Sequence, residues 1–196
     1  MHRMGPGRLQ VISGPMFAGK SEELMRRVRR AQLAGLSVEA VNHELDAGRG
    51  TGDIAAHTGL RLASRAVPDA TGLRQLVTGR RLDLLAIDEA QFFGAELIPV
   101  VDELVLAGVT VAVSGLCVTF DGLPFEPLPS LMALAEEVVK LTAVCSVCGE
   151  DAAYHQRTDA RPTGSAGESS LTPEAEHVGG SETYQARCRR HFTAGR

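Results

Sequence analysis

The chain has 196 residues, which suits one medium domain or one domain with a small appendage, and its hydrophobic fraction of 44% is ordinary for a globular core. Its formal net charge is −4 and it has no long basic run, which argues against nonspecific nucleic-acid binding. Neither an apolar N-terminal stretch nor a run of about 18 apolar residues occurs, which argues against a secretory signal and a membrane span and favours a cytoplasmic protein.

Apolar runs alternate with helix-like segments along roughly the first 140 residues. This alternation predicts an α/β fold in which helices cover both faces of a parallel sheet and the crossovers are right-handed. The almost unbroken apolar run 82–87 is typical of a central strand in such a sheet. In chain order, the sequence predicts strands at 9–13, 38–41, 82–87 and 109–114, and helices at 21–34, 72–78, 96–106 and 128–139.

A phosphate-binding loop is predicted between the first strand and the first helix, where the sequence fits the pattern G-x-x-x-x-G-K-[ST]. Glycines let backbone N–H groups turn toward phosphate oxygens, and the following helix presents its positive end to the same anion. Lys20 is then placed to reach the β- and γ-phosphates of ATP, and Ser21 to bind Mg²⁺. The strand–loop–helix context disfavours the alternative, a glycine-rich turn without a ligand. The predicted ATP-binding residues of the loop are Gly14, Pro15, Met16, Phe17, Ala18, Gly19, Lys20 and Ser21.

A second nucleotide-binding element is the apolar strand 82–87 followed by Asp88 and Glu89. An acidic residue at this place, the Walker B position, would bind the hydrated Mg²⁺, which is the role predicted for Asp88. A carboxylate at Glu89 can accept a proton from an attacking hydroxyl or water. Acidic pairs also open ordinary turns, but the phosphate-binding loop roughly 70 residues earlier favours the nucleotide-binding interpretation.

Two pairs of potential metal ligands lie near the C-terminus, Cys145-x-x-Cys148 and Cys188-x-x-His191. Within each pair, the two-residue gap lets both side chains converge on one ion. Three thiolates and one imidazole fill a tetrahedral Zn²⁺ site without an open position, so the zinc is predicted to be structural. A redox-active C-x-x-C is the alternative, and it leaves Cys188 and His191 unexplained.

The segment 159–176, between the two ligand pairs, is rich in Pro, Gly, Ser, Thr and Glu and contains one large apolar residue, Leu171. Such a segment cannot bury enough apolar surface to order itself, so a disordered linker is one interpretation. A loop of this length inside a compact protein is often a functional lid, which is the other interpretation. The composition alone leaves both open.

Four phenylalanines gather after two of the predicted strands, at Phe92, Phe93, Phe120 and Phe125. Their spacing is that of ordinary core residues, which is the simpler interpretation. The same rings are also suited to line a pocket for a planar base. Cys117 lies beside an apolar strand and outside the set of zinc ligands. It is predicted to be a small residue that is buried or lines the pocket.

Together these motifs resemble the thymidine kinase family of the small, zinc-containing, P-loop type. The resemblance spans residues 9–192, and the motifs occur in the family's order. It implies an α/β fold with a P-loop NTPase core, whose parallel sheet is flanked by helices, over residues 1–141. It also implies a small C-terminal zinc-binding domain with a lasso that closes over the substrate, over residues 142–196. The matching segments are 14–24, 87–93, 124–125, 134–136, 140–145 and 179–188.

The resemblance further implies transfer of the γ-phosphoryl group of ATP to the 5′-hydroxyl of thymidine, with deoxyuridine as a further substrate. It assigns Glu89 as the general base, Ser21 and Asp88 to Mg²⁺, and Asp88 and Gln91 to the ATP site. It implies a structural Zn²⁺, a homotetramer, and deoxythymidine triphosphate as a feedback inhibitor. The substrate-binding residues that it implies are Met16, Phe92, Leu116, Phe120, Phe125, His177, Val178, Gly179 and Tyr184.

Two positions depart from the family pattern and bear on nucleoside selectivity. Cys117 stands where an Asp commonly follows the pocket leucine, and His155 stands where a threonine lies near the thymine methyl group. A second function class is a nucleotide-gated P-loop module whose zinc lobe binds a protein or nucleic acid. The segment 159–176 is acidic rather than basic, which disfavours a polyanion-binding arm.

Overall fold

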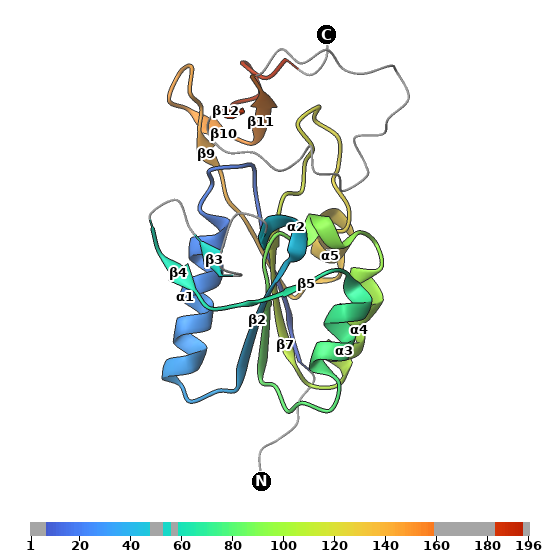
Figure 1. Cartoon of the computed structure of the whole chain (residues 1–196). Coiled ribbons are helices and arrows are strands. Elements are labelled where there is room, and N and C mark those ends of the chain that lie inside the picture. The colour runs from blue at the N-terminus through green and yellow to red at the C-terminus, as the bar shows by residue number, and fades with distance from the viewer. Residues whose placement is uncertain (1–6, 48–52, 56–58, 159–182, 194–196) are drawn as a thin grey trace.

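The computed structural model describes residues 7–47, 53–55, 59–158 and 183–193. At its centre lies a six-stranded sheet in which every pair of neighbours is parallel (Figure 1). The inner strands are almost fully buried, as expected for a parallel sheet covered on both faces. In spatial order the strands are β5 (Arg65–Val67), β2 (Val38–His43), β6 (Leu84–Ile87), β7 (Thr110–Gly115), β1 (Leu9–Ser13) and β8 (Glu137–Lys140).

One face of the sheet is covered by helix α1 (Lys20–Leu33). Its buried residues Leu24, Met25 and Val28 share one side of the helix and pack with Ile12 of β1. That spacing is the period of an amphipathic helix, and it explains why this segment folds as one. The arginines of the helix lie mostly on the opposite, solvated side.

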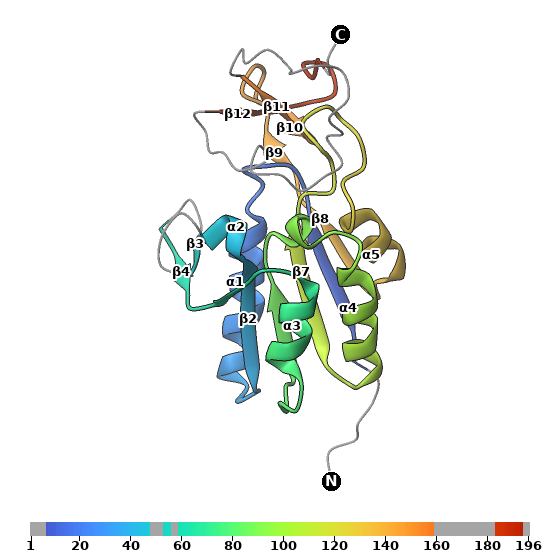
Figure 2. The same ribbon diagram turned by 45° about the vertical axis from the view of Figure 1, so that its right-hand side comes forward.

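The other face is covered by α3 (Ala70–Val77), α4 (Leu97–Leu106) and α5 (Leu128–Leu134), which Figure 2 shows side by side. Their apolar residues join those of the sheet in the larger hydrophobic core. Helix α3 begins at an N-cap, where the Asp69 side chain accepts a hydrogen bond from the Gly72 N–H at 2.7 Å. Every helix in the described part of the chain is too short or too polar to cross a lipid bilayer.

A small lobe lies beyond the carboxyl ends of the strands (Figure 1). It consists of two antiparallel pairs, one of β9 (Ala143–Val144) with β10 (Asp151–Ala152), the other of β11 (Tyr154–Arg157) with β12 (Tyr184–Arg187). The remaining short elements are α2 (Glu44–Ala47), β3 (Ile54–Ala55), β4 (Arg61–Leu62) and the 3-10 helix η1 (Ala90–Phe93).

The predicted fold class is confirmed by the parallel sheet between helical layers and by a C-terminal Cys₃His cluster. One predicted element is wrong in extent: the helix expected over 128–139 ends at Leu134, and Glu137–Lys140 form β8. Val138 and Val139 are β-branched and pair in parallel with Val11 and Ile12. Their fit beside the edge of the sheet outweighs the helical tendency of the segment before them.

Candidate functional site

The loop between β1 and α1 has the backbone that phosphate binding requires. Gly14 and Gly19 have positive φ angles of 152° and 81°. A Cβ atom at Gly14 would lie 2.6 Å from the carbonyl oxygen of Leu141, so no other residue fits there without movement. Helix α1 begins at Lys20, directly after the loop, so its free N-terminal N–H groups adjoin those of the loop.

Gly14→Ala is expected to weaken ATP binding at least tenfold, because the new methyl group must displace the loop or the backbone at Leu141. Isothermal titration with ATP measures the change. Gly35→Ala is a matched control, since Gly35 also has a positive φ, 74°, but a Cβ there would meet no atom within 4 Å. A Gly14→Ala variant that binds ATP as tightly as the unaltered protein would contradict this prediction.

Lys20 lies between the loop and the acidic residues after β6. Its side chain is buried, and Nζ donates a hydrogen bond to the carbonyl oxygen of Pro15 at 2.8 Å. Burial lowers the pKa of Lys20, while the nearby negative charges of Glu89 and Asp88 act in the opposite direction. The structure therefore brings together the two nucleotide-binding elements that the sequence separates by roughly 70 residues.

Asp88 follows β6 and is buried at the carboxyl edge of the sheet. Its carboxylate accepts hydrogen bonds from the hydroxyl groups of Ser114 and Ser21. Burial, and then the charge of Glu89, raise the pKa of Asp88 to about 7, although the two hydrogen bonds lower it. A buried carboxylate beside a second carboxylate and a serine hydroxyl is a donor set of hard oxygens, which fits Mg²⁺.

Glu89 is half-buried and has a left-handed backbone, with φ 49° and ψ 45°. This conformation is unfavourable for a residue with a Cβ atom, by about 1 kcal/mol or more, and is maintained only by the surrounding structure. The side-chain amide of Gln91, in η1, donates a hydrogen bond to the Glu89 carboxylate. The backbone and the side chain of Glu89 are thus both held in place.

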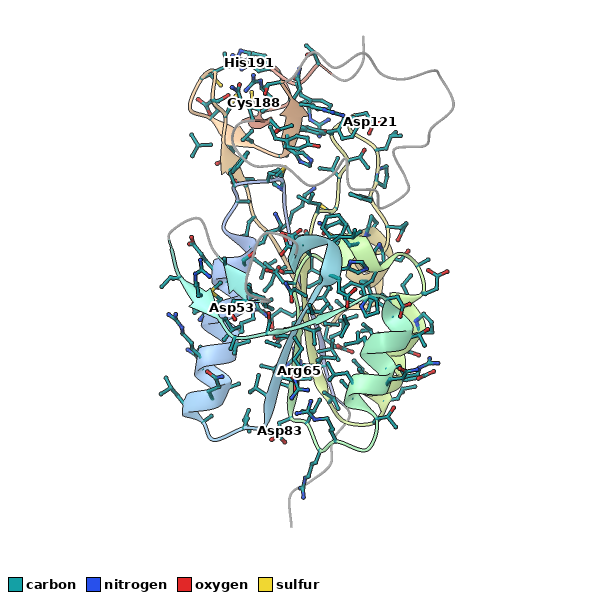
Figure 3. All side chains as sticks on the ribbon, in the orientation of Figure 1. Asp53, Arg65, Asp83, Asp121, Cys188 and His191 are labelled. Atoms are coloured by element: carbon teal, nitrogen blue, oxygen red, sulfur yellow. The ribbon has the colours of Figure 1, made fainter. Side chains whose placement is uncertain are left out.

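The four predicted zinc ligands converge in the small lobe, where their ligand atoms all lie within 4.8 Å of one another. The Sγ atoms of Cys148 and Cys188 are 3.8 Å apart, and His191 Nδ1 is 3.3 Å from Cys188 Sγ and 3.7 Å from Cys145 Sγ. A zinc tetrahedron with Zn–S bonds of about 2.3 Å has edges of about 3.8 Å, so the geometry fits. Figure 3 shows Cys188 and His191 together at the end of the molecule opposite Asp83.

The chemistry of the cluster also fits zinc. Burial raises the pKa of the Cys145 thiol, but backbone hydrogen bonds from Cys188, Val147 and Cys148 outweigh it and lower that pKa to about 5. A thiolate rather than a thiol is the ligand that zinc takes, so the fold prepares this residue for the metal. The tight turn between the first two ligands is closed by the Gly149 N–H, which donates to the Cys145 carbonyl at 2.9 Å.

The phosphate-binding loop packs directly against the zinc lobe. Phe17 and Ala18 contact the small apolar cluster of the lobe, which includes Cys145 and Cys188. Phe17 has a left-handed backbone, with φ 66°, which is unfavourable for a bulky residue. Its contact with the lobe helps to keep the loop in this conformation.

Phe17→Ala is therefore expected to raise the Kd for ATP about tenfold and to leave zinc content unchanged, because the loop loses its contact with the lobe while the ligands stay intact. Isothermal titration and elemental analysis check the two parts. Phe93→Leu, in the larger core and outside the loop, serves as a control for general destabilisation. An unchanged Kd for ATP would contradict the contact's role.

Part of the predicted nucleoside pocket forms where β12 of the small lobe meets the segment after β7. The rings of Phe120 and Tyr184 lie 6.4 Å apart, and His155 lies edge-on to Tyr184 at 5.8 Å. Leu116 and Phe125 are buried on the segment that follows β7. Phe92 is also buried, and Met16 is half-buried. The predicted contacts His177, Val178 and Gly179 and the segment 159–176 lie outside the described residues.

Ser114 is a site residue that none of the sequence motifs indicated. It is the fifth residue of β7 and is buried, and its hydroxyl donates to Asp88. The available signal was a serine near the carboxyl end of an apolar strand, where ligands of parallel sheets bind. Ser114 reaches Asp88 because β7 lies next to β6 in the sheet, and no local sequence motif specifies that strand order.

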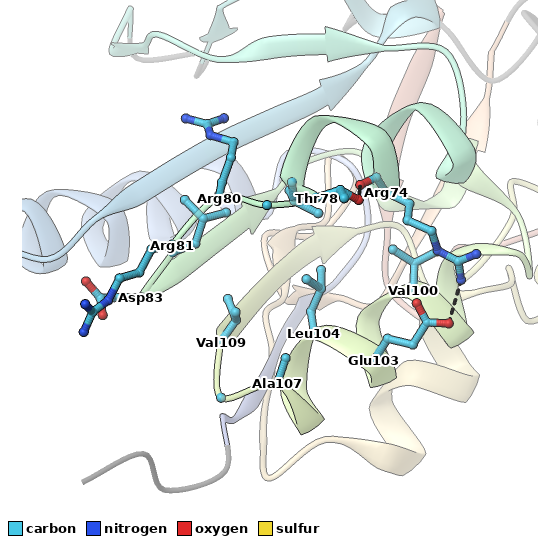
Figure 4. A pocket seen from close by; sticks show the side chains of 14 residues that line it. Arg74, Thr78, Arg80, Arg81, Asp83, Val100, Glu103, Leu104, Ala107 and Val109 are labelled. Carbon is cyan, nitrogen blue, oxygen red and sulfur yellow. Dashed lines mark hydrogen bonds and ion pairs between the residues drawn. The ribbon is translucent and has the colours of Figure 1, made fainter. Parts of the chain in front are cut away.

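A cleft of about 830 Å³ lies at the other end of the sheet, between α3, α4 and the turn before β6 (Figure 4). Arg74 and Glu103 form an ion pair across part of the cleft, at 2.7 Å. On the side of the turn, the cleft is lined by Arg80, Arg81 and Asp83. Because parallel sheets bind ligands at the carboxyl ends of their strands, this cleft at the amino ends is not the nucleotide site.

Comparison with known proteins agrees with this geometry. The family model described as thymidine kinase matches residues 7–192. The thymidine kinase of Halobacterium salinarum is 43% identical over 194 residues, covering 93% of this chain and 92% of that protein. The thymidine kinase of Deinococcus radiodurans is 44% identical over 160 residues, 77% of this chain and 76% of that protein. That of Deinococcus deserti is 40% identical over 199 residues, 97% of this chain and 96% of that protein.

Proposed function

The chain belongs to the thymidine kinase family, and we propose that it transfers the γ-phosphoryl group of ATP to the 5′-hydroxyl of thymidine. The products are thymidine 5′-monophosphate and ADP. The observation that carries the proposal is the proximity of Lys20, on the phosphate-binding loop, to the carboxylates of Asp88 and Glu89. That arrangement places a phosphate-binding cation beside a candidate base.

In the proposed reaction, the N–H groups of the loop and of the first turn of α1 bind the phosphates, and Lys20 neutralises charge on the transferring group. Glu89 accepts the proton of the 5′-hydroxyl as the 5′-oxygen attacks the γ-phosphorus. Ser21 and Asp88 would hold Mg²⁺, which supplies charge neutralisation between the β- and γ-phosphates. Phosphoryl transfer depends mostly on such positioning, so rigid support of Glu89 is of direct use.

Thymidine is proposed to bind between the segment after β7 and the small lobe. Leu116, Phe125 and Tyr184 are buried and Phe120 is half-buried, so apolar and aromatic side chains would line a site for a small planar base. The backbone around His177 to Gly179 is proposed to read the pyrimidine edge. Family membership extends the proposal to weaker use of deoxyuridine, inhibition by deoxythymidine triphosphate, and a homotetramer.

A panel of nucleosides tests the proposal, with ADP formation measured in the presence of ATP and Mg²⁺. Thymidine is expected to give the fastest rate, deoxyuridine a slower one, and purine nucleosides none. ADP formation that no nucleoside stimulates would refute the proposal. A thermal shift produced by a short oligonucleotide and by no nucleoside would instead support the nucleotide-gated binding module.

A further inference from the structure

We propose that Gln91 is a positioning residue that fixes the Glu89 carboxylate and links it to the nucleoside-binding segment after β7. The inference rests on the proposed function, in which Glu89 is the base. Gln91 is 1% exposed, and its side-chain amide bridges two groups that are distant in sequence. One end contacts Glu89, and the other contacts the backbone of Leu116.

The orientation of the Gln91 amide follows from its partners. The Leu116 N–H can only donate, so the atom that faces it, at 3.0 Å, must be the amide oxygen Oε1. The amide NH₂ group must then face Glu89, where it donates to Oε2 of the carboxylate. This donor holds one carboxylate oxygen of Glu89 and, because each oxygen has two lone pairs, leaves the carboxylate able to accept a proton.

The Gln91 amide packs closely against Gly115. A Cβ atom at Gly115 would lie 2.6 Å from Gln91 Oε1 and 3.1 Å from the backbone N of Ala90. The amide is therefore enclosed by the end of β7 on one side and by Glu89 on the other. Since burial also removes competing water, both hydrogen bonds are expected to persist.

This bridge connects nucleoside binding to the base. Leu116 is a predicted substrate contact, and its N–H sets the position of Gln91, which in turn sets the position of Glu89. The strained backbone of Glu89, with φ 49°, gives a reason for such support, because a residue in that conformation would otherwise relax. We expect a displaced Glu89 to lose turnover rather than ATP affinity.

Two variants of Gln91 test its two hydrogen bonds, one to Glu89 and one to Leu116. Gln91→Glu keeps an oxygen facing the Leu116 N–H but replaces the donor to Glu89 by a second carboxylate. Gln91→Met has a similar length and lacks both hydrogen bonds. Each is expected to lower kcat for thymidine phosphorylation about 30- to 100-fold, since a misplacement of about 1 Å can cost a factor of about 100. The KM for ATP should change less than about threefold, because the phosphate-binding loop is untouched.

The decisive comparison uses a double-mutant cycle. In a Glu89→Gln background, Gln91→Met should lower the residual kcat by less than about twofold, because there is no base left to position. A merely structural Gln91 would instead lower kcat by the same factor in both backgrounds. That outcome, or a kcat of Gln91→Met within twofold of the unaltered enzyme, would overturn the inference. If the unaltered enzyme forms no ADP with thymidine, the proposed function itself fails.

Discussion

Glu89→Gln is expected to lower kcat about 10²- to 10⁴-fold, which is the range that a positioned general base contributes. Glutamine has the same shape but cannot take the proton of the 5′-hydroxyl. The Kd for ATP should stay within about threefold, because the phosphates are bound by the loop and by Lys20 rather than by Glu89. Steady-state assays of ADP formation and titration with ATP measure the two quantities.

Glu103→Gln is a suitable control for this prediction. Glu103 is an exposed carboxylate on α4, in the cleft at the opposite end of the sheet, where it pairs with Arg74. Loss of a surface ion pair changes stability by about 1 kcal/mol or less, and kcat should not change measurably. A Glu89→Gln variant that retains a third or more of the normal kcat would show that Glu89 is not the base.

Loss of the zinc site is expected to have the second large effect, on stability. Cys148→Ser removes one of the four zinc ligands. Because Cys148 is exposed, the substitution itself disturbs little packing. Among its described residues the lobe has only a small apolar cluster of its own, so we expect it to depend on the metal to stay folded. We expect zinc content to fall from one ion per chain to nearly none. The thermal midpoint should fall by about 6–12 °C, the shift for about 3 kcal/mol in a chain of this size.

Elemental analysis and thermal melts check this prediction, and the control is Cys117→Ser. Cys117 is the cysteine outside the cluster, so its replacement should leave zinc content unchanged. ATP affinity of Cys148→Ser should also fall, because Phe17 packs against the lobe that we expect the metal to stabilise. Full zinc content or an unchanged melt in Cys148→Ser would contradict a structural metal.

The parts of the site that could be predicted from sequence are those fixed by short-range geometry. Local backbone shape is determined by the glycines before Lys20 and by the two-residue gaps within the zinc pairs. The sequence pattern therefore predicts these two parts of the site directly. The family resemblance drawn from these motifs is confirmed by the family match over residues 7–192.

The parts that could not be predicted depend on contacts between distant segments. Ser114 reaches Asp88 because β7 lies beside β6, with Ile87 opposite Val113, and no local pattern specifies that register. The strand Glu137–Lys140 follows a helix-like segment and was predicted as part of that helix. It is stabilised by its pairing with β1, a contact between distant segments that the local sequence does not indicate. The bridge made by Gln91 likewise needs the end of β7 to be close to η1.

Whether this site transfers a phosphoryl group to a 5′-hydroxyl is decided by comparing three acceptors with ATP and Mg²⁺. Thymidine and 3′-deoxythymidine should both form ADP together with a nucleoside 5′-monophosphate, identified by phosphorus NMR. 5′-Deoxythymidine, which lacks the accepting oxygen, should form neither. Phosphorylation of 5′-deoxythymidine, or ADP formation that is the same with and without thymidine, would contradict the claim.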